Sequence, residues 1–238
     1  MKNLQGKVVL ITGAGRGIGK AIARTFAKEK CNLMLTARTK SELEQTTNEL
    51  NKEGIKVEYQ IADVSKKTDV EKLVDRTIRI FGQCDVLINN AGVGIFKPVY
   101  EMSDEDWHSV IDTNLTGVFY MTRSVLPYMR EKKSGYIINI SSLAGQNTFP
   151  GAAAYCASKF GLNGFSECLM QDVRHDNIKV SYISPGSVNT DFGRSKKEEN
   201  SWKIDPEEIG QLCVHLVKMS DVTLASKIEV RPTKPPKK

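Results

Sequence analysis

The chain has 238 residues, of which 40% are hydrophobic and 26% are charged, and its formal net charge is +6. This length can bury a substantial core without disulfides or metals, and nothing in the composition demands a second domain. Aromatic residues make up only 7% and positive residues are spread along the chain, which argues against a nucleic-acid interface and favours a solvated basic surface.

Apolar runs of strand length alternate with segments of helix length. The expected strands are Lys7–Thr12, Asn32–Ala37, Val57–Ile61, Val86–Asn89, Tyr136–Ile140, Val180–Ser184 and Lys227–Arg231. The expected helices are Gly17–Lys30, Ser41–Glu53, Lys66–Phe81, Ser103–Lys132, Ala152–His175 and Pro206–Met219. Repeated strand–helix alternation predicts a doubly wound parallel sheet of about seven strands, and continuously apolar strands predict helices on both faces. We therefore expect one Rossmann-like α/β domain over residues 1–238, ending in a basic tail at 234–238.

Local signals mark where individual helices begin or end. Ser103-Asp104-Glu105-Asp106 and Asp205-Pro206-Glu207-Glu208 each place a capping side chain before the acidic residues of a first turn. Pro127 falls inside the Ser103–Lys132 pattern and is expected to kink or end that helix, because proline lacks an N–H donor.

A glycine-rich turn joins the first expected strand to the first expected helix. It reads Thr12-Gly13-Ala14-Gly15-Arg16-Gly17-Ile18-Gly19, with the spacing GxxxGxG rather than the commoner GxGxxG. Glycines permit a tight turn and close backbone approach to a phosphate, and the helix N-terminus adds free N–H groups and a favourable dipole. Because strand and helix flank it, the turn predicts a bound dinucleotide rather than a ligand-free connection.

The end of the second expected strand bears on cofactor choice. An acidic residue there usually binds the ribose 2′-hydroxyl of NAD, but this chain has Thr36-Ala37-Arg38-Thr39. Arg38, with Arg16 from the glycine turn, has the planar fork of donors that suits a 2′-phosphate. The pattern favours NADP(H); the alternative is that both arginines are ordinary surface residues.

Tyr155 and Lys159 are four residues apart in an expected helix, so they share one face. A free tyrosine has a pKa near ~10, and a neighbouring ammonium lowers it enough for acid–base work. Ser142 follows the strand Tyr136–Ile140, where it is placed to hydrogen-bond a substrate oxygen. The pair alone is common in amphipathic helices, but beside a dinucleotide turn it indicates an oxidoreductase.

Taken together, these features resemble the short-chain dehydrogenase/reductase family over nearly the whole chain. The matching motifs are Thr12-Gly13-x-x-x-Gly17-x-Gly19, Asn89-Asn90-Ala91-Gly92, Asn114, Ser142, Tyr155, Lys159, and Pro185-Gly186 followed by Val188 and Thr190. Several independent motifs in one order make the resemblance specific.

The resemblance implies a catalytic set. Tyr155 would donate the proton as hydride reaches the carbonyl carbon, and Ser142 would orient and stabilise the oxygen. Lys159 would hold the nicotinamide ribose and tune Tyr155, and Asn114 would support a water leading to Lys159. For Asn114 the alternative is a helix kink.

The resemblance also implies the cofactor contacts. They are Gly13, Gly15, Arg16, Gly17, Ile18, Gly19, Arg38, Asp63, Val64, Asn90, Ala91, Gly92, Tyr155, Lys159, Pro185, Gly186, Val188 and Thr190. Asp63-Val64 would contact adenine, with a loop cap as the alternative for Asp63, and Asn90 with Gly92 would line the adenosine and ribose side. The cofactor implied is NADP(H), and no metal site is suggested.

The substrate region is less specific. A largely apolar pocket is expected from Phe96, Leu143, Ala144, Gln146, Phe149, Val188 and Phe192. The polar segment between Asn189 and Ile204 resembles the family's mobile substrate loop. The layout is similar to 3-oxoacyl-carrier-protein reductases, but Ser220–Lys227 contains no glycine, and the ending looks nearer to sepiapterin-reductase-like carbonyl reductases.

We expect an NADPH-dependent reductase of a small-molecule carbonyl. The alternatives are a 3-oxoacyl reductase, a dinucleotide-binding sensor without turnover, and an epimerase or dehydratase on the same fold. A homodimer or homotetramer is expected by resemblance, through the segments Ser103–Lys132 and Ala152–His175. There Phe160, Leu162, Phe165 and Leu169 could form the contact or belong to the core.

The expected location is the cytoplasm, without a membrane span. Five scattered cysteines without a CxxC pair fit reduced thiols better than a disulfide framework. The apolar run before the glycine turn is too short to span a membrane and lacks a small-residue cleavage site.

Overall fold

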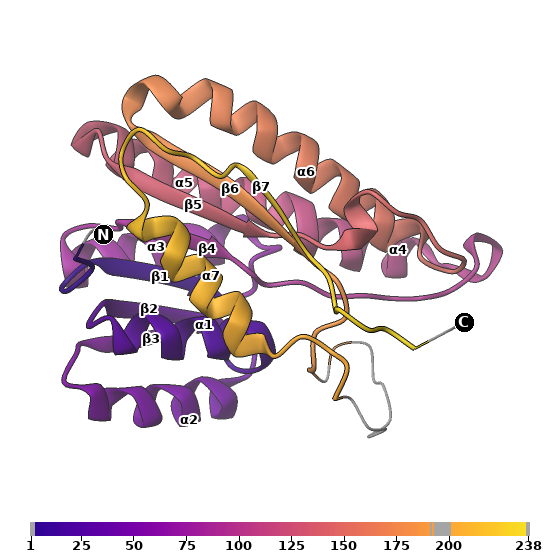
Figure 1. The fold of residues 1–238 in the computed structure, drawn as a ribbon, viewed down its shortest axis with the longest axis horizontal. Helices are drawn as coiled ribbons and strands as arrows, with labels where there is room; N and C mark the ends of the chain where they lie inside the picture. Colours follow the sequence, from indigo (N-terminus) through magenta and orange to yellow (C-terminus); the bar gives the residue numbers. More distant parts are fainter. Residues whose placement is uncertain (1–2, 191, 193–200, 237–238) are drawn as a thin grey trace.

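The computed structural model describes residues 3–190, 192 and 201–236. Seven parallel strands form one sheet in the order β3-β2-β1-β4-β5-β6-β7 (Figure 1). Their bounds are β1 Val8–Thr12, β2 Asn32–Ala37, β3 Val57–Ile61, β4 Val86–Asn89, β5 Gly135–Ile140, β6 Ile178–Pro185 and β7 Lys227–Val230. The order confirms the predicted doubly wound α/β fold.

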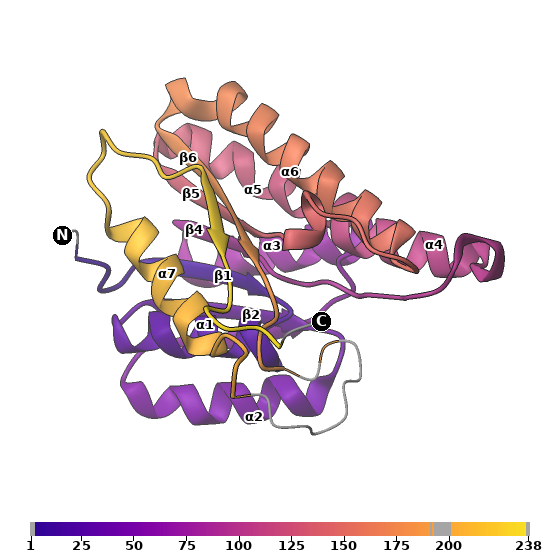
Figure 2. The same ribbon diagram turned by 45° about the vertical axis from the view of Figure 1, so that its right-hand side comes forward.

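Helices cover both faces of this sheet (Figures 1 and 2). One face packs against α1 Gly17–Lys28, α2 Lys40–Leu50 and α7 Pro206–Lys218. The other packs against α3 Lys67–Phe81, α5 Gly117–Lys132 and α6 Ala153–Val173, and α4 Asp104–Ile111 contacts α6. Short 3₁₀ turns lie at Asn51–Glu53, Val99–Glu101, Leu143–Gly145 and Arg174–Asp176.

The strands are apolar on both sides because both sides are core. In β1, Val9 and Ile11 enter the core beneath α1, α2 and α7, whereas Leu10 enters the core beneath α3, α5 and α6. All five residues of β1 are buried. Burying alternate residues of one strand in two separate cores is what removes the period-2 polarity of a one-sided sheet.

One expected element is wrong: the segment Ser103–Lys132 is not a single helix. A π-helical turn at Asp112–Thr116 separates α4 from α5, and Pro127 lies inside α5 without ending it. Asn114 sits in this turn, where its amide pairs with the backbone of Val93 instead of facing solvent. Single π-turns inside helices are frequent at functional sites, so the break concerns the site and not Pro127.

The two capping predictions are confirmed. The Ser103 hydroxyl accepts the Asp106 N–H at 3.1 Å while the Asp106 carboxylate accepts the Ser103 N–H at 3.3 Å, which forms a capping box. The Asp205 carboxylate accepts the Glu207 N–H at 2.9 Å at the start of α7.

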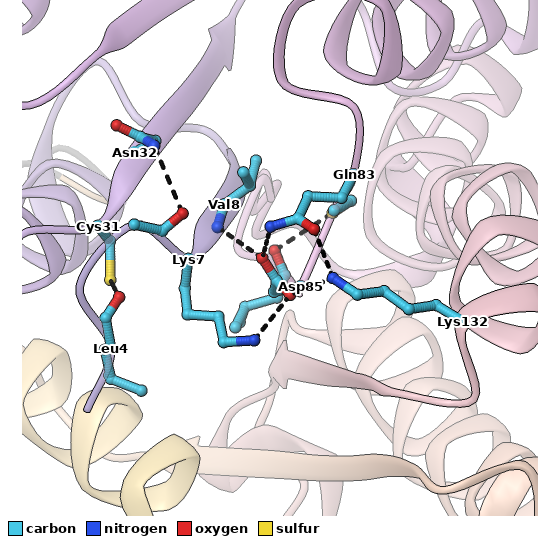
Figure 3. A network of polar contacts seen from close by, with 11 residues as sticks. Leu4, Lys7, Val8, Cys31, Asn32, Gln83, Asp85 and Lys132 are labelled. Carbon is cyan, nitrogen blue, oxygen red and sulfur yellow. Dashed lines mark hydrogen bonds and ion pairs between the residues drawn. The ribbon is translucent and has the colours of Figure 1, made fainter. Parts of the chain in front are cut away.

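A network of polar contacts lies at the amino ends of the strands, which we call the amino edge of the sheet. It is centred on Asp85, directly before β4 (Figure 3). The buried Asp85 carboxylate accepts the Val8 N–H at 2.8 Å and the Gln83 amide at 2.8 Å. It also forms ion pairs with Lys7 at 3.1 Å and Lys132 at 3.0 Å. Lys7 and Val8 lie at the start of β1, Gln83 precedes β4 and Lys132 precedes β5, so the network joins the beginnings of three neighbouring strands.

None of the helices in the described part of the chain has the length and apolar content needed to cross a membrane.

Candidate active site

A cleft of about 1270 Å³ opens at the carboxyl ends of the strands. The strands that follow β1 extend the sheet toward β3, whereas those that follow β4 extend it toward β7. This reversal leaves a crevice between the carboxyl ends of β1 and β4, which is where open α/β sheets bind ligands. The expected cofactor residues that line the cleft are Gly13, Gly15, Arg16, Gly17, Ile18, Arg38, Asp63, Val64, Asn90, Ala91, Gly92, Tyr155, Lys159, Pro185, Gly186, Val188 and Thr190. Gly19 is the member of that set that does not line it.

The conformation of the glycine turn requires residues that have no Cβ atom. Gly13 has a φ of +65°, and a Cβ there would lie 2.9 Å from the Asn90 amide nitrogen. A Cβ on Gly19 would lie 2.2 Å from the Gly13 carbonyl oxygen, so Gly19 packs helix α1 onto the turn rather than facing a ligand. Helix α1 has no side-chain cap and no acidic residue in its first turn. Its first N–H groups are thus left for an anion, and the turn fits a pyrophosphate.

Asn90 clamps the two strand ends that form the crevice. Its amide nitrogen donates to the carbonyl oxygens of Thr12 at 2.9 Å and Gly13 at 3.2 Å. In return, the Thr12 hydroxyl accepts the backbone N–H groups of Asn90 and Ala91, each at 3.0 Å. Asn90 lines the cleft as expected, but its side chain also forms hydrogen bonds with the protein backbone, a role that the sequence did not predict.

Charged residues gather near the glycine turn, at the end of the cleft that Arg16 and Arg38 line. Glu42, from the first turn of α2, also lines the cleft and forms a 3.7 Å ion pair with Arg16. A Cβ on Gly15 would lie 2.8 Å from the Glu42 Cβ, so the carboxylate is held directly over the turn. The sequence reading missed Glu42, because an acid in a first helical turn is an ordinary helix-stabilising residue.

Ser142, Tyr155 and Lys159 meet at the opposite end of the cleft. Lys159 is buried; its Nζ donates to the Ile140 carbonyl oxygen at 2.9 Å and lies 5.8 Å from the Tyr155 ring centroid. Burial lowers the pKa of Lys159 to about 8, and the described residues offer it no carboxylate partner. Burial raises the pKa of Tyr155, while a hydrogen bond with Ser142 acts in the opposite direction. The expected lowering of this pKa by Lys159 is therefore wrong, because desolvation of the phenol outweighs the effects that favour the phenolate.

Asn114 lies behind this group and does not line the cleft. It is fully buried; its Nδ2 donates to the Val93 carbonyl at 2.9 Å and to the Ser158 hydroxyl at 3.0 Å, and its Oδ1 accepts the Val93 N–H at 2.8 Å. Ser158, which the sequence reading missed, in turn donates to the Tyr155 carbonyl oxygen at 2.7 Å. Asn114 therefore joins the segment after β4 to the helix that carries Tyr155.

The Asp63 carboxylate accepts hydrogen bonds from the N–H of Ser65 at 3.1 Å and from its hydroxyl at 2.7 Å. This is the loop cap that we considered as an alternative, although Asp63 and Val64 both line the cleft.

On the other side of the cleft, a Cβ on Gly186 would lie 3.0 Å from Pro232 and 3.1 Å from Leu143. Gly186 thus allows the segment after β6 to pack closely between them.

Six of the seven residues expected to form the substrate pocket line the cleft: Phe96, Leu143, Ala144, Phe149, Val188 and Phe192. Gln146 does not, and its amide donates to the Glu229 carboxylate at 2.7 Å. That contact comes from β7, which is distant in sequence. Most of the charged segment before Ile204, residues 193–200, lies outside the described residues. No group of three or more metal-ligating side chains occurs in the part that is described.

A model of the short chain dehydrogenase family matches residues 7–201. Sepiapterin reductase from Chlorobaculum tepidum is 34% identical over 234 residues, which is 95% of this chain and 96% of that protein. An oxidoreductase of Staphylococcus saprophyticus, also 34% identical, aligns with 98% of this chain and all of its own length.

Two solved structures are similar over 98% of this chain and all of theirs. One is a metagenomic short-chain oxidoreductase in complex with NADP, with 35% identity and a TM-score of 0.88. The other is an alcohol dehydrogenase from the archaeon Thermococcus sibiricus complexed with 5-hydroxy-NADP, with 31% identity and a TM-score of 0.91.

Proposed function

The chain belongs to the short-chain dehydrogenase family, and from that premise we propose that it is an NADPH-dependent reductase that converts a carbonyl to an alcohol. One observation carries the proposal: Ser142, Tyr155 and Lys159 line the same cleft as the glycine turn. A proton donor and a dinucleotide site in one cleft can bring both halves of a carbonyl reduction to the same substrate.

The cofactor proposal rests on the charged end of the cleft. Arg16 and Arg38 both line it, and the acid that would bind a ribose 2′-hydroxyl is absent from the end of β2. The two similar solved structures hold NADP and 5-hydroxy-NADP. When bound, NADPH supplies the hydride that reduces the carbonyl carbon.

Tyr155 is the proposed proton donor. Burial raises the pKa of its hydroxyl, which keeps the phenol protonated at neutral pH and suits donation to a developing alkoxide. The Ser142 hydroxyl accepts the Ala144 N–H at 3.1 Å, which fixes the oxygen. Its hydrogen bond with Tyr155 keeps the two hydroxyl groups together, where both can donate to one substrate oxygen.

Lys159 supplies the positive charge beside this pair. Its ammonium has three donors and the Ile140 carbonyl takes one, so two remain for a ribose hydroxyl and for a proton path. The charge also opposes the cost of forming a phenolate on Tyr155 when the proton leaves. Asn114 is a positioning residue in this proposal, holding Val93 and Ser158 around the site.

We also propose a homo-oligomer formed through α5 and α6. Phe119 on α5 and Phe160 on α6 are exposed, whereas Leu162 and Leu169, considered earlier for the same contact, are buried in the core. Exposed aromatic side chains are enriched where chains associate. Sedimentation that shows a monomer at micromolar concentration would refute this proposal.

The test of the reductase is Tyr155→Phe, assayed by NADPH oxidation with diketones, aldehydes, pterin carbonyls and an acetoacetyl thioester. We expect kcat to fall by about 10³-fold, within the range of general acid catalysis, while the Kd for NADPH changes by less than about twofold. Tyr100→Phe is the matched control, because Tyr100 is exposed and does not line the cleft.

One outcome would overturn the proposal. NADPH binding without turnover of any carbonyl would favour the dinucleotide-binding sensor, to which loss of the Tyr155 hydroxyl is indifferent. Rapid turnover confined to the thioester would retain the carbonyl reductase and identify it as a 3-oxoacyl reductase.

A further inference from the structure

Three half-exposed phenylalanines converge on Tyr155. Phe96 follows β4, Phe149 precedes α6 and Phe192 follows β6, and their exposed fractions are 44%, 48% and 46%. The ring centroids of Phe96 and Phe192 lie 5.6 and 5.8 Å from that of Tyr155. The Phe149 ring lies 5.9 Å from Phe96 and extends the group outward. Such distances are those of interacting aromatic pairs.

These three phenylalanines are a cluster rather than isolated exposed apolar residues. Five phenylalanines are exposed in the described part of the chain, and three of them are these residues, contributed by separate segments. Gly94 permits their approach, because a Cβ there would lie 2.9 Å from Phe96 and 3.2 Å from Phe192. Aromatic surface that is left uncovered inside a concave site marks a place for an apolar ligand.

Among the described residues, few polar groups lie beside Ser142 and Tyr155, and the buried Lys159 is the charged one. Lys203 also lines the cleft, on the segment that pairs with Val188. Ser142 and Asn147 line it beside Leu143 and Ala144. Lys97, next to Phe96 in sequence, does not line the cleft and forms a 2.6 Å ion pair with Asp106. A substrate carboxylate or phosphate would therefore find no unpaired exposed cation among the described residues of this wall.

We propose that the substrate is a neutral compound whose carbonyl is attached to a flat aromatic ring, rather than an aliphatic acyl chain or a carboxylate. This rests on the reductase proposed above. The ring contacts Phe96, Phe149 and Phe192, and the carbonyl oxygen lies toward Ser142 and Tyr155. Stacked and edge-on aromatic contacts add affinity beyond the area that they bury, so a flat ring is favoured over a saturated ring of the same size.

The experiment uses the matched pair 1-phenyl-1,2-propanedione and 1-cyclohexyl-1,2-propanedione. With NADPH, we expect kcat/KM to favour the phenyl compound by about 10- to 100-fold, since two or more aromatic contacts are lost in the cyclohexyl compound. Phenylglyoxylate adds a carboxylate next to an aryl ketone and should be reduced far more slowly. Equal kcat/KM for the two diones, or preference for an acetoacetyl thioester, would overturn the inference.

Variants locate the preference. Phe96→Leu/Phe149→Leu should reduce the phenyl-to-cyclohexyl ratio to about threefold or less, because the lost contacts are aromatic rather than simply apolar. Tyr100→Leu, which changes an exposed aromatic residue outside the cleft, should leave the ratio unchanged. Unaltered NADPH affinity shows that the double variant is folded. A double variant that binds NADPH normally and keeps the full ratio would contradict the assignment of these rings.

A binding measurement separates this inference from the reductase proposal. The diones are titrated calorimetrically into protein saturated with NADP⁺, which has no hydride to give. Tighter binding of the phenyl compound supports the aromatic site even if no carbonyl is turned over, an outcome that would remove only the reductase. Turnover of both diones together with equal binding would retain the reductase and remove the aromatic site.

Discussion

The amino and carboxyl ends of the strands, here called the amino and carboxyl edges of the sheet, each contain a buried charged group, but only the group at the amino edge has partners of opposite charge in the described structure. At the amino edge, the Asp85 carboxylate is surrounded by two lysines, an amide and a backbone N–H (Figure 3). At the carboxyl edge, Lys159 is equally buried, yet in the described structure its ammonium donates to one backbone carbonyl and has no carboxylate partner. A satisfied buried charge holds a fold together, whereas an unmatched one destabilises the fold and is retained where chemistry needs it.

The pKa values follow the same division. Burial alone would raise the pKa of Asp85, but the Val8 N–H, Lys132 and Lys7 together lower it below its usual value. Burial lowers the pKa of Lys159 to about 8 because nothing charged offsets it. Changes at the amino edge should therefore affect stability more than catalysis, and changes at the carboxyl edge the reverse.

Ser142→Ala gives the largest expected effect. Removing one preorganised donor to the substrate oxygen should lower kcat/KM by about 10²- to 10³-fold. Since the Ser142 hydroxyl bonds the neighbouring Ala144 N–H and Tyr155 within the cleft, the free energy of unfolding should change by less than about 1 kcal/mol. Steady-state kinetics and urea denaturation of the same preparation provide the two readouts. An equally large loss of stability would contradict the division between the edges.

Asp85→Asn should lower the free energy of unfolding by about 2 kcal/mol, because it removes the buried carboxylate that pairs with the partly exposed Lys7 and Lys132. The sign of the pH dependence follows from the lowered pKa of Asp85. Its stabilisation is present above the unfolded-state pKa and is lost as the pH falls through the folded-state pKa. Denaturation between pH 3 and 7 should thus show a shallower acid loss in the variant. A substantial fall in NADPH affinity would contradict the comparison.

Lys159→Met should stabilise the cofactor-free protein by about 1 to 2 kcal/mol at pH 7, because an apolar side chain replaces an unmatched buried charge. The folded-state pKa of Lys159 is lowered, so the destabilisation is full below about pH 8 and is relieved as the pH rises toward the unfolded-state pKa. The advantage of the variant should therefore shrink at pH 10. Denaturation at both pH values without NADPH would reveal it, and a destabilised variant would contradict the argument.

Glu42→Gln should have the smallest effect. Its carboxylate neutralises Arg16 and lies over the glycine turn, so removing the charge should tighten NADPH binding by about threefold through weaker repulsion of a 2′-phosphate. NADH lacks that phosphate, and its Kd should stay nearly constant. Fluorescence titrations of both cofactors are the measurement, with Glu44→Gln as the control because Glu44 does not line the cleft. Equal changes for NADPH and NADH would count against this role.

Local sequence signals predicted much of the fold and a set of site residues, most of which line one cleft. The strands Asn32–Ala37, Val57–Ile61 and Val86–Asn89 have the predicted bounds, because turn residues delimit each apolar run. The break at Asp112–Thr116 corresponds to the helix kink considered as the alternative for Asn114, but the contact of Asn114 with Val93, 21 residues earlier in the chain, was not predictable. Gln146 was placed in the pocket by its proximity to Ser142, whereas Glu229 draws it away.

The sequence by itself determined the alternation of elements, the glycine turn and the helical Tyr155–Lys159 spacing, because each depends on backbone preferences within a few residues. Only the tertiary structure decided that Lys159 is buried without a carboxylate partner among the described residues and that Glu42 lies over Gly15. It also decided that Phe96 and Phe192 lie beside Tyr155, with Phe149 next to Phe96. These features arise where segments far apart in sequence meet at one edge of the sheet. Burial and charge pairing are properties of that meeting, and no single segment specifies them.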